Sequence, residues 1–188
     1  GTIPSALANC SALLHLSLQG NALRGILPAA VASIPSLQIL SVSRNLLSGA
    51  IPAAAFGGGR HSSPRLLQLG DNQFSMVDVP GGPGKGLQVE DRGGNKLGGP
   101  FPTWLVEAQG LTVLNLSGNA FTGDLPAAVG QLTSLQELRL GGNALTGTVP
   151  PEIGRCGALQ VLALEDNSFS GEVPAALGGL RRLREVYL

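Results

Sequence analysis

One asparagine recurs along the chain at a nearly constant spacing, and this period limits the possible folds more than any other feature. The series is Asn21, Asn45, Asn72, Asn95, Asn119, Asn143 and Asn167. Five of its six intervals are 23 or 24 residues long, and the remaining one is 27. Chains with a period of roughly 20–50 residues stack their repeats side by side, because no single unit can bury its apolar face alone. The sequence therefore predicts a solenoid.

Each repeat is expected to form a short strand, a turn and a segment that leads the chain back to the start of the next strand, called the return below. Apolar residues stand five and three positions before the asparagine, as Leu138 and Leu140 do before Asn143, and this alternation is typical of a strand with one buried face. The asparagine amide is both a donor and an acceptor, so it can satisfy backbone groups in a buried turn. A glycine four residues later permits a tight turn, and a pair such as Val149-Pro150 leads into a helical or 3-10 return.

These repeats resemble the plant extracellular type of leucine-rich repeat, found in receptor-like kinases and receptor-like proteins. The resemblance rests on the stretches LTVLNLSGNAFTGDLPAAVGQLTSL (111–135) and LQELRLGGNALTGTVPPEIGRCGAL (135–159), and it covers nearly the whole chain. It implies an α/β solenoid: a right-handed leucine-rich-repeat superhelix with a concave parallel β-sheet, short helical or 3-10 returns, and a second small sheet. We expect one array over residues 1–188, with about seven repeats and partial repeats at both ends.

Two segments interrupt the period. Residues 53–65 contain three extra residues, and residues 76–86 lack both the turn glycine and the usual return. We expect both to be tolerated surface loops with local disorder, because lengthening a surface loop costs little free energy. The chain also begins and ends inside a repeat, so we expect a piece of a longer protein that self-associates when purified alone.

Composition argues against two classes of function. The chain has 12 basic and 12 acidic residues, whereas a nucleic-acid surface needs a basic excess. His15 and His61 are the only histidines, and no spacing suggests a metal site, a catalytic triad or a cofactor. We therefore expect a non-enzymatic segment; the resemblance implies that a serine/threonine kinase domain and a membrane anchor could lie elsewhere in the parent protein.

The predicted concave face supplies the candidate binding residues. Its side chains precede each asparagine by six, four or two positions and suit an extended peptide or a protein edge. The polar candidates are Ser17, Gln19, Ser41, Ser43, Gln68, Asp91, Asn115, Arg139, Glu165 and Tyr187. Asn9 and Asn115 also begin N-x-[ST] glycosylation sequences, and a glycan on Asn115 would cover part of this face.

The two cysteines are not expected to form a disulfide. Cys10 and Cys156 occupy the same repeat position six repeats apart, or roughly 29 Å at the spacing of stacked strands, which a disulfide cannot span. Both are expected to be free thiols in the apolar row.

Three functions remain open. The first is a segment of a plant receptor-like kinase ectodomain that binds a peptide or protein ligand, and possibly a co-receptor, on the extracellular side of the plasma membrane. The second is a secreted inhibitor of a cell-wall-degrading enzyme, similar to polygalacturonase inhibitors. The third is a structural spacer within a longer array.

Residues 87–95, LQVEDRGGN, contain a conflict with the repeat. Glu90 and Arg92 stand at the two positions that should point into the core. Burying both charges costs several kcal/mol per ion before their attraction is counted. We expect the pair to neutralise itself at a locally opened strand, the weakest of the stack, so that leucine at both positions raises the melting temperature. A variant repeat and a deliberate polar site are the alternatives.

Overall fold

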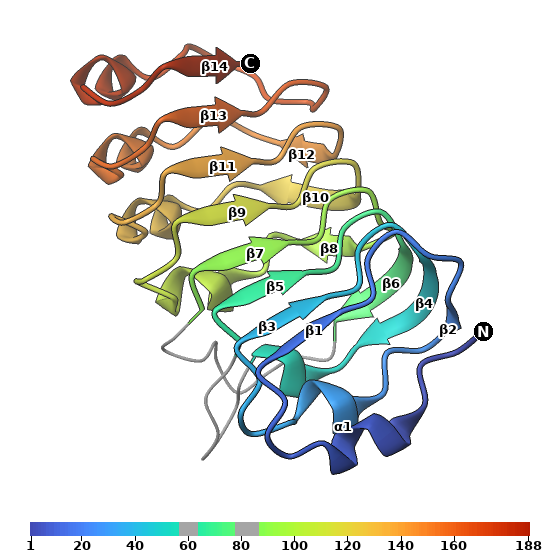
Figure 1. Ribbon diagram of the computed structural model, residues 1–188. Helices are drawn as coiled ribbons and strands as arrows, with labels where there is room; N and C mark the ends of the chain where they lie inside the picture. Colours follow the sequence, from blue (N-terminus) through green and yellow to red (C-terminus); the bar gives the residue numbers. More distant parts are fainter. Residues whose placement is uncertain (57–63, 78–86) are drawn as a thin grey trace.

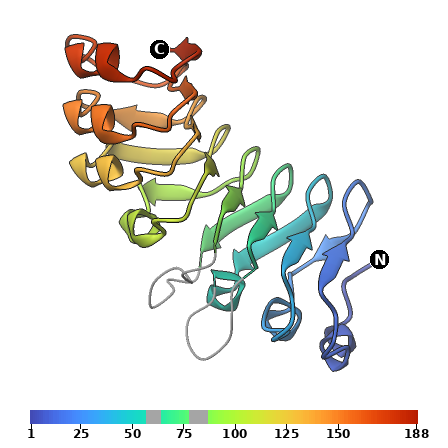
Figure 2. The same cartoon turned by 60° about the vertical axis from the view of Figure 1, so that its left-hand side comes forward.

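The computed structural model describes residues 1–56, 64–77 and 87–188, which form a curved stack of repeats (Figures 1 and 2). An eight-stranded parallel sheet follows the stack from one end to the other. Its strands are β1 (His15–Ser17), β3 (Ile39–Ser41), β5 (Leu66–Gln68), β7 (Val89–Asp91), β9 (Val113–Asn115), β11 (Glu137–Arg139), β13 (Val161–Ala163) and β14 (Glu185–Tyr187). This arrangement confirms the predicted α/β solenoid.

A second set of parallel strands begins just after the repeat asparagines. These strands form two three-stranded sheets rather than one. The first sheet contains β2 (Arg24–Gly25), β4 (Leu46–Ile51) and β6 (Gln73–Val77), and the second contains β8 (Gly98–Pro100), β10 (Ala120–Asp124) and β12 (Ala144–Thr146). Gly123 and Gly147 have φ angles of 74° and 73°, which explains why the turn position four residues after the asparagine favours glycine.

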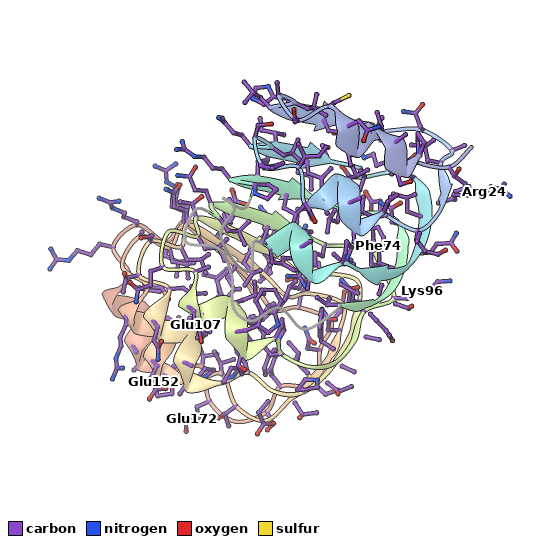
Figure 3. All side chains as sticks on the ribbon, turned by 90° about the horizontal axis from the view of Figure 1, so that it is seen from below. Arg24, Phe74, Lys96, Glu107, Glu152 and Glu172 are labelled. Atoms are coloured by element: carbon purple, nitrogen blue, oxygen red, sulfur yellow. The ribbon has the colours of Figure 1, made fainter. Side chains whose placement is uncertain are left out.

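Short helices return the chain to the next strand of the main sheet. They are η1 (Ser5–Asn9), α1 (Ala29–Ala32), η2 (Ala53–Phe56), η3 (Thr103–Glu107), η4 (Ala127–Gln131), η5 (Pro151–Arg155) and η6 (Ala175–Gly179). Most follow directly on a proline, whose fixed φ suits the entry into a helical turn. In the side-chain view of Figure 3, Glu107 and Glu152 lie over these returns, whereas Arg24 and Lys96 project from the opposite side. No helix of the described part of the chain is long and apolar enough to cross a bilayer.

The repeat asparagines form a hydrogen-bonded ladder inside the stack. The Oδ1 atom of Asn72 accepts the Leu47 backbone N–H at 3.0 Å, and its Nδ2 donates to the Val42 carbonyl of the preceding repeat at 3.0 Å. Nδ2 also lies 3.1 Å from the carbonyls of Leu69 and Gly70 in its own repeat. The amides of Asn45, Asn95, Asn119, Asn143 and Asn167 connect neighbouring repeats in the same way. They satisfy backbone groups in the turn, as the donor and acceptor of the amide predict.

The strand that contains Glu90 is fully paired, so the prediction of a locally opened strand is wrong. β7 pairs in register with both β5 and β9, with Glu90 opposite Leu67 on one side and Leu114 on the other. Glu90 and Arg92 are both completely buried. The predicted mutual neutralisation is confirmed, because Arg92 Nε donates to Glu90 Oε1.

The cysteine prediction is partly confirmed. Neither thiol forms a disulfide, but only Cys156 lies in the apolar row, while Cys10 is exposed beside η1 at the first repeat. Burial raises the pKa of the Cys156 thiol to about 11, so this side chain packs as a small apolar group. The two predicted loops fall largely on residues 57–63 and 78–86, which lie outside the described residues.

Candidate functional site

The middle of the concave sheet brings four predicted polar residues side by side. The strand register places Asp91 between Gln68 and Asn115, and Asn115 beside Arg139. All four are half-buried, so they present polar atoms to solvent while their stems are held by the sheet. Gln68, Asp91, Asn115 and Arg139 are called the concave strip below.

Hydrogen bonds fix the geometry of the concave strip. Asn115 Nδ2 donates to Asp91 Oδ1 at 3.0 Å, and the same oxygen accepts the Gly93 backbone N–H at 3.1 Å. Arg139 Nε donates to Glu137 Oε2 at 3.1 Å on its own strand. Side chains held in this way lose little further conformational freedom when a partner binds, which favours recognition.

Burial is the main cause that raises the pKa of Asp91 above its usual range. The neighbouring carboxylate of Asp71 adds to this effect, while the hydrogen bonds from Gly93 and Asn115 oppose it. Asp71 itself lies 3.7 Å from Arg44 Nε in an exposed ion pair. The strip carries an acidic group at Asp91, between Gln68 and Asn115, and a basic group at its end at Arg139.

Glycines lie beside the strip, two positions before the repeat asparagine. A Cβ atom on Gly93 would lie 2.8 Å from Asn115 Nδ2, and one on Gly141 would lie 2.5 Å from Glu165 Oε1. The side chain of the following repeat thus lies over the bare backbone of the glycine. A larger residue at either glycine would displace the Asn115 or the Glu165 side chain from its present position.

The other predicted binding residues differ from one another in their exposure to solvent. Ser17, Gln19 and Tyr187 are exposed at the two ends of the sheet, and Glu165 is half-buried, with an Oε2 atom that has no hydrogen-bond partner among the described residues. Ser41 and Ser43 differ from the expectation, because both are buried. Ser41 Oγ donates to Gln19 Oε1 at 3.2 Å, so the side chain of the preceding repeat covers this position.

The two predicted glycosylation positions have different environments. Asn9 is exposed in η1, whereas both amide atoms of Asn115 are engaged, with Oδ1 accepting the Ser117 backbone N–H at 3.0 Å. A glycan on Asn115 would break the hydrogen bond to Asp91. We therefore expect Asn9→Gln, but not Asn115→Gln, to remove one glycan mass from chain secreted by a eukaryotic host. Mass spectrometry of both variants checks this, and the opposite pattern would contradict it.

The repeat pattern identifies Arg92 as a conflict and leaves a deliberate polar site as one alternative, but it does not predict the aromatic surroundings of this side chain. Arg92 stacks beneath two aromatic rings, with its guanidinium carbon 4.5 Å from the Phe56 ring centre and 5.2 Å from the Trp104 ring centre. The two rings also pack on each other at 5.0 Å. Phe56 and Trp104 belong to returns of different repeats, so no local pattern connects them to Arg92. Among the described residues, no three His, Cys, Asp or Glu side chains could together hold a metal ion.

Comparison with known proteins supports the repeat assignment. The chain matches the Leucine Rich Repeat family over residues 110–132, 134–156 and 158–180. It is 80% identical over 57 residues, 30% of its length, to a probable inactive leucine-rich repeat receptor kinase, XIAO, of Oryza sativa subsp. japonica. That match spans only 5% of the rice protein.

The fold is also shared with solved receptor structures. The plant peptide hormone receptor RGFR1 in complex with RGF2 superposes with a TM-score of 0.89 and 34% identity, covering 100% of this chain and 30% of that one. The Arabidopsis receptor kinase HAESA, in complex with the peptide hormone IDA and the co-receptor SERK1, superposes with a TM-score of 0.84 and 32% identity, covering 96% and 30%. The chain folds as a leucine-rich-repeat solenoid and is similar to the ectodomains of plant leucine-rich-repeat receptor kinases, although it spans less than a third of the length of these relatives.

Proposed function

We propose that this array is a non-catalytic recognition segment of an extracellular plant receptor kinase ectodomain, and that it binds a peptide or protein ligand across the concave strip. The single observation that carries this proposal is the row of half-buried polar side chains on four adjacent strands. The receptors most relevant here, RGFR1 and HAESA, are described with bound peptide hormones, and HAESA also with a co-receptor.

The chemistry of the strip suits an extended chain. Gln68 and Asn115 offer both donors and acceptors, and the strip changes from acidic to basic between Asp91 and Arg139. An extended peptide presents backbone N–H and C=O groups at regular intervals and can match such a row. We expect a ligand with a basic or donor group near Asp91 and an acidic or acceptor group near Arg139.

The test uses the secreted chain and a display library of linear peptides, together with synthetic RGF2 and IDA. Peptides that bind the unmodified chain are then measured against Asp91→Asn/Arg139→Gln. Asp91→Asn keeps the shape of the side chain and Arg139→Gln keeps a polar side chain of reduced length, and both remove the charge. Because a few residues dominate most interfaces, we expect an affinity loss of about tenfold or more.

Glu152→Gln is the matched control, since it removes one charge on η5, over the returns and away from the concave sheet (Figure 3). It should leave the affinity unchanged. Peptides that bind Asp91→Asn/Arg139→Gln as tightly as the original chain, but bind Glu152→Gln more weakly, would place recognition on another face. A library without any binder would argue against peptide recognition by this segment.

A further inference from the structure

Three arginines gather where the chain enters the last strand of the main sheet. Arg181, Arg182 and Arg184 lie between η6 and β14, and all three are exposed. Together with Gln160 and Leu183 they line an open depression of about 380 Å³. Within the described part of the chain, no carboxylate forms an ion pair with any of the three arginines. This part of the surface therefore presents unpaired positive charge to solvent.

The same edge of the array is accessible in a repeat that has a neighbour on both sides. Thr133, Ser134 and Gln136 occupy the equivalent positions two repeats earlier, and all three are exposed. The strand that follows them, β11, pairs with both β9 and β13. Stacking of neighbouring repeats thus leaves these positions open, so the arginines belong to a continuous outer surface of the solenoid.

Glutamines continue this surface beside the arginines. The strand register places Gln136, Gln160 and Arg184 next to one another on three adjacent repeats, roughly 4.8 Å apart, each directly before its strand. Their backbone groups bind one another, because Gln160 N–H donates to the Gln136 carbonyl at 2.7 Å and Arg184 N–H donates to the Gln160 carbonyl at 2.8 Å. The side chains are left to contact a partner. The two glutamines and the three arginines are called the arginine edge below.

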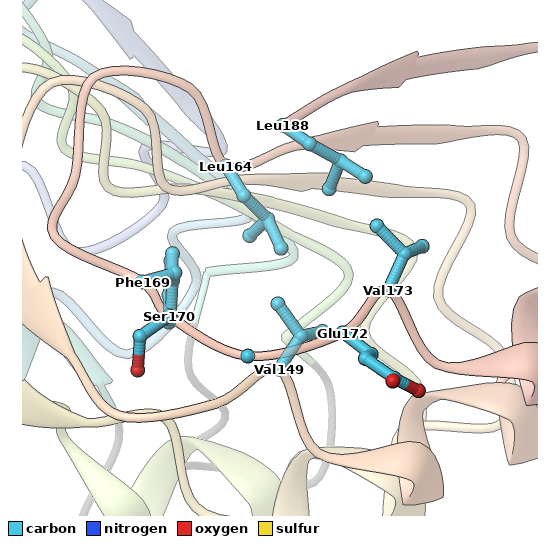
Figure 4. Close-up of a pocket in the computed structure, with 8 residues that line it drawn as sticks. Val149, Leu164, Phe169, Ser170, Glu172, Val173 and Leu188 are labelled. Carbon is cyan, nitrogen blue, oxygen red and sulfur yellow. The ribbon is translucent and has the colours of Figure 1, made fainter.

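The other pocket of the last repeat has a different character. It has a volume of about 160 Å³ and lies just after strands β13 and β14, where apolar side chains such as Leu164, Phe169 and Leu188 line it (Figure 4). Glu172 is the only charged residue among its described lining residues. The positive charge of this repeat is therefore concentrated where the strands begin.

We propose that the arginine edge binds an acidic oligosaccharide, whose carboxylates are held by the arginines and whose hydroxyl groups contact the glutamines. A guanidinium offers a carboxylate two parallel N–H groups, and an amide can both donate to and accept from a hydroxyl. A chain of uronic acids carries both groups on each sugar. A peptide recognised through its backbone would need free backbone partners, whereas the N–H groups of Gln160 and Arg184 are engaged within the array. The arginine edge is separate from the concave strip, so this proposal does not depend on peptide binding there.

Isothermal titration calorimetry of the chain with a short oligomer of galacturonic acid tests the proposal. The methyl ester of the same oligomer is the matched ligand control, because it keeps the sugar chain and removes the charges. At low ionic strength we expect a Kd of about 1 mM or lower for the acid, and binding at least about tenfold weaker for the ester. The affinity for the acid should fall at an ionic strength of about 0.15 M, because salt screens exposed charges.

Two double variants locate the binding site. Arg181→Gln/Arg184→Gln should weaken binding of the acid by about tenfold or more. Arg24→Gln/Lys96→Gln is the matched control, since it removes the same charge from exposed residues on the opposite side of the array (Figure 3) and should leave the affinity unchanged.

Three results would overturn the proposal: no saturable binding of the acid, equal binding of acid and ester, or equal losses in the two double variants. An oligomer of glutamate with the same number of carboxylates separates a sugar ligand from an acidic peptide. It should bind more weakly than the sugar acid, because it has no hydroxyl groups for the glutamines. Tighter binding of the glutamate oligomer would contradict the assignment to an oligosaccharide.

Discussion

Arg92→Met alone is expected to destabilise the chain by about 3–5 kcal/mol, because it leaves the completely buried Glu90 carboxyl without its partner. Glu90→Leu alone should cost a similar amount, since it leaves a buried guanidinium unpaired. Urea unfolding of both variants at neutral pH measures these losses. They are among the largest expected for any single substitution in this array.

The double variant Glu90→Leu/Arg92→Met should recover all of this loss. It should also be more stable than the original chain, by about 1–4 kcal/mol. Removing both charges ends the desolvation cost, which exceeds what their attraction returns. Methionine is preferred to leucine at position 92 because Arg92 is the largest fully buried side chain, and its replacement must still reach Phe56 and Trp104. A double variant as unstable as the single ones would show that the ion pair is a net source of stability.

The free energy of unfolding should depend on pH differently in the original chain and in the double variant. Desolvation raises the pKa of Glu90 above its ordinary value of 4.5, although Arg92 opposes the shift. The folded chain therefore binds a proton more readily than the unfolded chain, so the contribution of Glu90 to stability is greatest below about pH 4.5 and is lost as the pH rises through its folded pKa. Asp91, whose pKa is also raised, contributes in the same direction. The double variant should show a smaller decline, with only the Asp91 part remaining.

Asn72→Ala is expected to cost about 3 kcal/mol or more. The substitution leaves the Leu47 N–H without its acceptor and removes one of the two side-chain donors to the Val42 carbonyl, together with the bonds to the Leu69 and Gly70 carbonyls. Each unsatisfied buried polar group costs about 1–3 kcal/mol. Thermal unfolding should show a melting temperature lower by roughly 6–12 °C in a domain of this size.

Asn21→Ala provides the matched control. Asn21 is exposed and donates only to the carbonyls of Leu18 and Gln19 in its own repeat. Its loss should cost less than about 1 kcal/mol. Equal effects of the two substitutions would contradict the view that the asparagine ladder stabilises the stack by linking neighbouring repeats.

Much of the fold can be predicted from the sequence because the same pattern, alternating apolar residues at a fixed distance from an asparagine, occurs in every repeat. The alternation around Leu138 and Leu140 predicts their burial, and the fixed distance to Asn143 predicts the strand register. The same pattern places Asp91, Asn115 and Arg139 on one face, where the structure finds them.

The pattern fails where a side chain depends on contacts between repeats. Glu90 and Arg92 break the leucine pattern without opening their strand, because Phe56 and Trp104 supply a stacking site that leucine would not need. Phe56 and Trp104 lie in the returns η2 and η3 of different repeats, so this compensation joins segments too far apart for a periodic pattern to reveal. Ser41 is a second example, because its burial depends on Gln19 of the preceding repeat.

The central claim is that a partner binds the concave sheet while the returns serve as support. Site-specific photo-crosslinking tests it most directly, with a photoreactive phenylalanine analogue placed either at Ser117, just after β9 and beside the concave strip, or at Glu152 of η5. A library-selected peptide is then irradiated with each chain, and the adducts are mapped by mass spectrometry. We expect an adduct at position 117 that excess unlabelled peptide suppresses, and none at position 152. A suppressible adduct at position 152 with none at position 117 would contradict the claim.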